Sequence, residues 1–75
     1  MEKTLEQCVG DSLAHSIQNL SQALLEFNNR APRKVIRNSL AKSRLYMSNV
    51  EELLGFDLNE GIKLILKETE EENHE

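Results

Sequence analysis

Apolar residues recur at helical intervals along the first third of the chain. Between residues 5 and 27 they follow one another three or four positions apart, which places them on one stripe of an α-helix: Leu5, Val9, Leu13, Ile17, Leu20, Leu24 and Phe27. Gly10 interrupts this stretch, and Asp11 or Ser12 is suited to capping a new helix there. The pattern therefore predicts a helix over about residues 5–27, with a break or kink allowed after Gly10.

The segment NNRAPRK separates this helix from a second one. Pro32 disfavours helical backbone at Ala31 and suits the first position of a new helix. We expect the second helix to run to about Leu54, because Gly55 is a natural C-terminal stop. A short connection between two long helices predicts an antiparallel hairpin.

A shorter third helix is predicted to begin at the segment DLNE. Asp57 is a suitable N-cap, and Glu60 three residues later completes a capping-box-like pair. The helix has a short apolar stripe, formed by Leu58, Ile62, Ile65 and Leu66. After Lys67 the pattern ends in glutamates, so we expect one helical domain over residues 1–67 and a disordered acidic tail over residues 68–75.

The length and composition of the chain favour an all-α protein that self-associates. A chain of 75 residues buries only a small core, and its single cysteine, Cys8, excludes an internal disulfide. Tight helix packing and oligomerisation are then the available routes to stability. We expect a homo-oligomeric helical bundle in a reducing cytoplasm, with no membrane partner because no apolar run approaches about 18 residues.

Charge is segregated along the sequence, although the net charge is only −4. Residues 30–44 contain no acidic residue and six cations: Arg30, Arg33, Lys34, Arg37, Lys42 and Arg44. The C-terminal ETEEENHE is acidic. Like charges in such a block repel one another, so an anionic partner, either phosphate or an acidic protein surface, would relieve the repulsion. Nucleic acid is a disfavoured partner, because its binding depends on an excess of cations.

Two serines fall within the apolar face of the second helix. Ser39 and Ser43 are explained either by close helix packing, with each hydroxyl bonded to the carbonyl four residues earlier, or by donation from Ser43 to a ligand oxygen. Arg37 and Arg44 lie along one edge of this face, and Lys42 lies in another row. The sequence leaves both interpretations of the serines open.

The stretch SLAKSRLYMSNV, residues 39–50, resembles a signature of the small helical sponges with which bacteriophages sequester the cyclic oligonucleotide messengers of CBASS defence. That signature reads aliphatic, Ala, Arg or Lys, Thr or Ser, any residue, Leu, and is matched here by Leu40, Ala41, Lys42, Ser43, Arg44 and Leu45. The resemblance implies an all-helical oligomer that binds cyclic di- or trinucleotides between protomers without hydrolysing them.

The same resemblance implies Lys42 and Ser43 as the phosphate contacts, with Arg37 and Arg44 as neighbours by position. Tyr46, one turn after Lys42, is a candidate for stacking on a base. The family carries a base-stacking aromatic residue in its first helix, and this sequence has no clear equivalent before Phe27.

No arrangement of residues typical of a catalytic or metal site is recognisable. His15 and His74 have no second ligand at a suitable spacing, and no serine has a recognisable base or oxyanion donor. We therefore predict a non-enzymatic protein without metal or cofactor. The expected function is a phage-type anti-defence protein that sequesters cyclic oligonucleotides at subunit interfaces in the host cytoplasm. The alternative is a small oligomeric helical protein-interaction module, such as a phage inhibitor or an antitoxin-like partner that binds an acidic protein surface.

Overall fold

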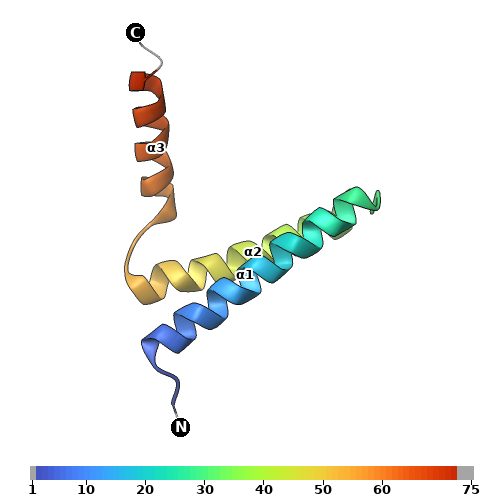
Figure 1. Cartoon of the computed structure of the whole chain (residues 1–75), viewed down its shortest axis with the longest axis horizontal. Coiled ribbons are helices and arrows are strands. Elements are labelled where there is room, and N and C mark those ends of the chain that lie inside the picture. Colours follow the sequence, from blue (N-terminus) through green and yellow to red (C-terminus); the bar gives the residue numbers. More distant parts are fainter. Residues whose placement is uncertain (1, 73–75) are drawn as a thin grey trace.

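The computed structural model describes residues 2–72, which form three helices (Figure 1). Helix α1 spans Leu5–Asn28, α2 spans Arg33–Leu54 and α3 spans Leu58–Glu72. Helices α1 and α2 pack side by side as an antiparallel hairpin. Helix α3 projects at a steep angle from the end of α2 and packs along neither of the other helices. The all-α hairpin with a third helix is thus confirmed for the described residues.

Helix α1 begins at a capping box that the apolar pattern did not reveal. The Thr4 hydroxyl accepts a hydrogen bond from the Gln7 amide at 3.1 Å, and the Gln7 side chain accepts one from the Thr4 amide at 2.9 Å. This reciprocal pair satisfies two amides at the helix end. The helix then continues through Gly10, so the break allowed there does not occur.

Both long helices are followed within two residues by a residue in the left-handed backbone region. Arg30 has φ 59° and follows α1, where the Ala31 amide donates to the Glu26 carbonyl and the Arg30 amide donates to the Phe27 carbonyl. Gly55 has φ 73° and ends α2, as predicted. Glycine adopts this conformation without a Cβ penalty, whereas Arg30 is held there by the turn. Pro32 was predicted as the first helical residue, but it is the N-cap of α2, which begins at Arg33.

Two glycine-to-alanine substitutions should shift stability in opposite directions. Gly55→Ala should lower the free energy of unfolding by about 1 kcal/mol, because a Cβ is strained at positive φ although nothing else lies within 4 Å. Gly10→Ala should raise it by about 1 kcal/mol, because Gly10 lies in a helix interior and its added Cβ meets open space. Urea denaturation measures both free energies, and changes of equal sign would contradict the placement of Gly10 in a helix interior and of Gly55 at a helix end.

The start of α3 is held by two carboxylates. The Asp57 side chain accepts from the Asn59 amide at 2.8 Å, which confirms its capping role. A second carboxylate comes from Glu51 of α2, which accepts from the Leu58 amide at 2.8 Å. The helix continues five residues past Lys67, where its end was predicted, because glutamate is a good helix former. Residues 73–75 of the predicted disordered tail lie outside the described residues, and that assignment stays a prediction.

The hairpin packs through small residues rather than through its large apolar ones. The buried positions are Ser12, Ser16, Ala23, Ser39, Ser43 and Val50. The Ser43 hydroxyl donates to the Ser16 carbonyl at 3.1 Å, and the two serine hydroxyls lie 2.9 Å apart. Since Ser43 has one hydroxyl proton, Ser16 donates in the second bond. Ser39 donates to the Glu26 carboxylate at 2.7 Å. These buried residues form the contact between α1 and α2, which we call the seam. The seam brings the two helices close together, and the hydroxyls of Ser16, Ser39 and Ser43 are hydrogen-bonded across the interface.

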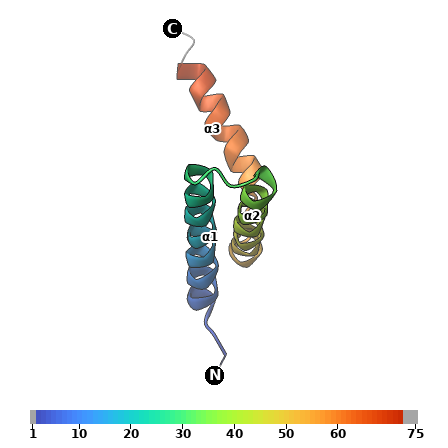
Figure 2. The same ribbon diagram turned by 90° about the vertical axis from the view of Figure 1, so that its right-hand side faces the viewer.

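Seven of the large apolar residues lie on one side of the hairpin, which we call the inner face. It comprises Leu13, Ile17, Leu20 and Leu24 of α1 together with Ile36, Leu40 and Met47 of α2. The four α1 residues are all exposed, and so is Leu40. Because α1 and α2 form a single layer (Figure 2), no other helix of the described chain covers this face. A stable domain normally needs a second layer.

Candidate functional site

Ser43 lies in the seam and is not accessible to a ligand within the protomer. Its exposed fraction is 0%, and its hydroxyl is engaged with Ser16. Of the two interpretations of the serines, the structure supports close helix packing. The bonds differ from those expected, because the hydroxyl reaches the neighbouring helix instead of the carbonyl four residues earlier. The protomer therefore offers no phosphate contact at Ser43.

The cations predicted to accompany Ser43 do not converge on one site. At 100° per residue, Lys42 is rotated about 160° from Arg44 and about 140° from Arg37 around α2. Arg37 and Arg44 border the inner face, on the side of Leu40. Lys42 points to the opposite side of the hairpin, which we call the outer face. The four predicted phosphate contacts thus divide into one buried hydroxyl, one outer-face cation and two inner-face cations.

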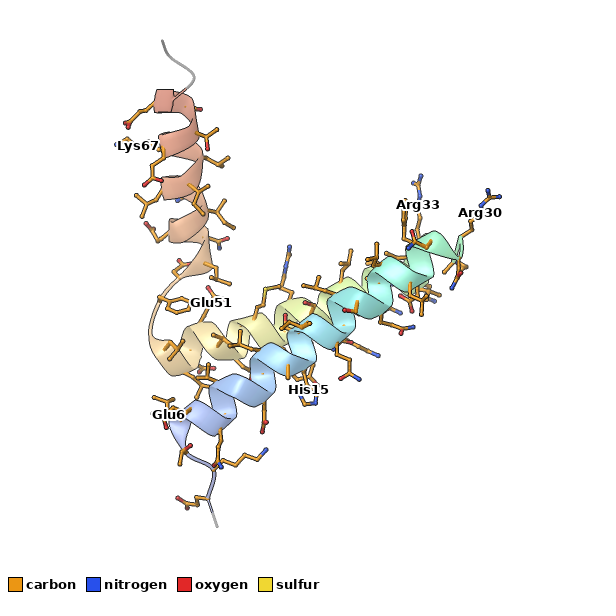
Figure 3. The ribbon with its side chains drawn as sticks, viewed as in Figure 1. Glu6, His15, Arg30, Arg33, Glu51 and Lys67 are labelled. Atoms are coloured by element: carbon orange, nitrogen blue, oxygen red, sulfur yellow. The ribbon has the colours of Figure 1, made fainter. Side chains whose placement is uncertain are left out.

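The outer face combines Lys42 with a pair of stacked rings. Tyr46 is half-buried and lies about 40° from Lys42 around α2, one turn further on. Its ring stacks on that of His15 from α1, with centroids 4.8 Å apart and planes 27° apart. Figure 3 shows His15 on the side of the hairpin away from α3. Sequence reasoning missed His15 as a partner for Tyr46, because their pairing depends on the register of the two helices.

The hydrogen bonds of His15 determine which of its nitrogens remains available. Nδ1 lies 2.7 Å from the Asp11 carbonyl oxygen, which only accepts, so Nδ1 carries a proton. Nε2 is then the acceptor in the neutral ring. The Asp11 carboxylate is engaged by Lys3, and this hydrogen bond lowers the pKa of Asp11 and raises the pKa of Lys3. The outer face therefore offers Lys42, two aromatic rings and one imidazole nitrogen.

A row of arginines follows the border of the inner face. Arg33, Arg37 and Arg44 lie on the same side of α2, within about 40° of one another. All three are exposed. Figure 3 shows Arg33 near the loop end of the hairpin, close to Arg30. This arrangement places positive charge directly beside exposed apolar surface, which suits a partner that is both apolar and acidic.

Residues 2–72 contain no cluster of three histidine, cysteine or acidic side chains suited to a metal ion. In the same part of the chain, no helix has the length and apolar character needed to cross a membrane. Cys8 is a free, half-buried thiol. Comparisons with known protein families, curated proteins and solved structures give no match to this chain.

Proposed function

We propose that this protein is a non-enzymatic, homo-oligomeric binding protein that sequesters a cyclic oligonucleotide at its outer face. Lys42 contacts phosphate, and the His15–Tyr46 pair provides the aromatic surface for a base. The ligand class comes from the resemblance of residues 39–50 to the phage sponges of cyclic oligonucleotide messengers. A messenger that is bound without hydrolysis no longer reaches the host defence that it activates. Withholding the messenger in this way is the anti-defence role that the resemblance implies.

The observation that carries the proposal is the placement of Lys42 beside a stacked ring pair. A cation near an aromatic surface is the combination that binds a nucleotide, because phosphate takes the charge and a base stacks on a ring. His15 also supplies a ring from the first helix. The phage sponges that residues 39–50 resemble have their stacking aromatic residue in that helix. Two copies of Lys42 meet the two phosphates of one cyclic dinucleotide where the outer faces of two protomers adjoin, in a contact separate from the inner face.

Alanine substitutions on the two sides of α2 should separate this proposal from its alternative. Lys42→Ala should abolish the binding of cyclic di- and trinucleotides and leave the oligomer intact, because Lys42 lies away from the inner face. Tyr46→Leu should weaken binding by about tenfold, the equivalent of one lost base stack of about 1–2 kcal/mol. Arg44→Ala, on the opposite side, is the matched control and should change the affinity less than twofold.

Isothermal titration calorimetry with a panel of cyclic dinucleotides and trinucleotides, at two salt concentrations, measures these affinities. The affinity of the parent should fall as salt rises, because the contact is partly ionic. A parent protein that binds no member of the panel, or a Lys42→Ala protein that binds as the parent does, would remove the proposal.

The second candidate is a protein-interaction module that docks on an acidic protein surface. The arginine row beside the exposed inner face favours it, because these residues are accessible while Ser43 is buried. In this case the substitution pattern reverses: Arg37→Ala and Arg44→Ala weaken the interaction, and Lys42→Ala leaves it unchanged. The same variants, tested against a captured partner, therefore discriminate between the two functions.

A further inference from the structure

We infer that the inner face of each hairpin is covered by α3 from a second copy of the chain, in a reciprocal exchange of third helices. This inference rests on the self-association included in the proposed function and names the segment that mediates it. It concerns the inner face and is independent of the ligand at the outer face.

Helix α3 is amphipathic and packs along no other helix of residues 2–72. Its apolar stripe consists of Leu58, Ile62, Ile65 and Leu66, all exposed. Lys67 is rotated about 155° from the centre of this stripe. Figure 3 shows Lys67 on the side of α3 away from the hairpin, so the stripe faces the angle between α3 and the hairpin.

The inner face of the hairpin borders the same open angle. Leu13 and Leu24 are rotated about 160° and 180° from His15 around α1. Since His15 points away from α3, these leucines face the side from which α3 projects (Figure 3). The two arms of the molecule thus present apolar surfaces to a shared space. Their lengths also match, because the α3 stripe and the segment from Leu13 to Leu24 each extend over about 12–17 Å at 1.5 Å per residue.

The two surfaces carry complementary charges. Arg33, Arg37 and Arg44 border the inner face, and Glu68 and Glu70 lie at either side of the α3 stripe. When α3 of a second copy lies on the inner face, its acidic end meets the arginine row of the first copy. The turn at residues 55–57 directs α3 away from its own hairpin, because Gly55, Asp57 and the Glu51–Leu58 bond fix its geometry. The occupant that fits is therefore α3 of a partner copy.

The exposed area of the protomer agrees with an extensive interface. A compact monomer of 8.6 kDa exposes about 4,700 Å². This protomer exposes 6668 Å² and has a radius of gyration of 15.9 Å, against about 11 Å for a compact chain of this length. The excess of about 2,000 Å² per copy lies in the range that permanent oligomers bury.

Two neighbouring residues of α3 give a matched test of the stripe. Ile65 and Leu64 are 62% and 61% exposed, but Leu64 is rotated about 145° from the centre of the stripe. Ile65→Glu should raise the dissociation constant for self-association at least a hundredfold, and Leu64→Glu should change it less than threefold. Light scattering over a concentration series measures both. An oligomer that is unaffected by Ile65→Glu, or equally weakened by both changes, would overturn the inference.

A charge exchange distinguishes a partner's α3 from the protomer's own. The first variant, Arg37→Glu with Arg44→Glu, and the second, Glu68→Lys with Glu70→Lys, should each self-associate at least tenfold more weakly than the parent. An equimolar mixture should regain the parental mass, because each hairpin then meets an α3 of opposite charge. Recovery only when all four changes are placed in one chain would show that α3 closes on its own hairpin, and would overturn the inference.

The control for general charge attraction is Lys34→Glu with Lys67→Glu, which lowers the net charge from −4 to −8 as the first variant does. Its cations lie outside the inner-face border, so it should self-associate as the parent does. Equal weakening by this control would also overturn the inference. A parent that is monomeric throughout the series would remove self-association as a whole, including that part of the proposed function. An oligomer that is insensitive to α3 would remove only the exchange.

Discussion

Leu24→Glu should convert the protein into a monomer at micromolar concentration. Leu24 is 62% exposed in the protomer and lies within about 10° of the centre of the α1 stripe, so its substitution leaves the fold of the hairpin intact. Burying one leucine side chain contributes about 2 kcal/mol, and a two-fold dimer loses this contribution twice. The resulting loss of about 4 kcal/mol corresponds to about a thousandfold increase in the dissociation constant, before the cost of burying the glutamate.

Leu25→Glu is the matched control for this prediction. Leu25 is 54% exposed and follows Leu24 directly in the sequence, but it is rotated about 110° from the centre of the α1 stripe. It should leave the molecular mass measured by light scattering unchanged. Circular dichroism should show the same helicity for both variants. Retention of the oligomer by Leu24→Glu would contradict the assignment of the inner face as the assembly surface.

Ser43→Leu should separate α1 from α2 and remove most of the thermal stability of the hairpin. The site has an exposed fraction of 0%, so a larger side chain has no space unless the helices move apart. Overpacking costs about 1–3 kcal/mol, and the lost bonds to Ser16 add about 1 kcal/mol. This is a large share of the stability of a 75-residue chain, which is about 4–11 kcal/mol at 0.05–0.15 kcal/mol per residue.

A series at this site separates the effect of volume from that of hydrogen bonding. Ser43→Ala should lower the free energy of unfolding by about 1 kcal/mol, because only the bonds are lost. Ser48→Leu, on an exposed position of the same helix, should change it by less than about 0.5 kcal/mol. Thermal and urea denaturation measure all three. A Ser43→Leu protein as stable as the parent would contradict the close seam.

The series also bears on the proposed ligand site. Because Ser43 is inaccessible, any loss of ligand affinity in Ser43→Ala should follow the loss of stability and should disappear at lower temperature. Lys42→Ala should lose affinity at every temperature, since Lys42 is exposed and lies outside the seam. This contrast distinguishes a residue that supports the fold from one that touches the ligand.

The sequence determined the elements of this protein, because helix boundaries depend on local chemistry. Apolar residues three and four positions apart predicted α1 and α2 to within a few residues, and the helix stop at Gly55 was correct. The capping role of Asp57 also followed from its position before an apolar run. The end of α3 was predicted too early, because glutamates that form no apolar pattern still favour helix.

Tertiary structure alone decided which face of each helix is buried. Amphipathicity indicates an apolar stripe, but it does not specify whether that stripe faces the neighbouring helix or remains free for a partner. Here the hairpin closes through Ser16, Ser43 and Ala23, and the leucines remain exposed. Residues adjacent in sequence are therefore separated in function: Ser43 is buried in the seam, Lys42 faces outward beside Tyr46, and Arg44 borders the inner face. A motif read along the chain groups these three residues, whereas the 100° turn per residue and the packing of α1 against α2 place them on different surfaces.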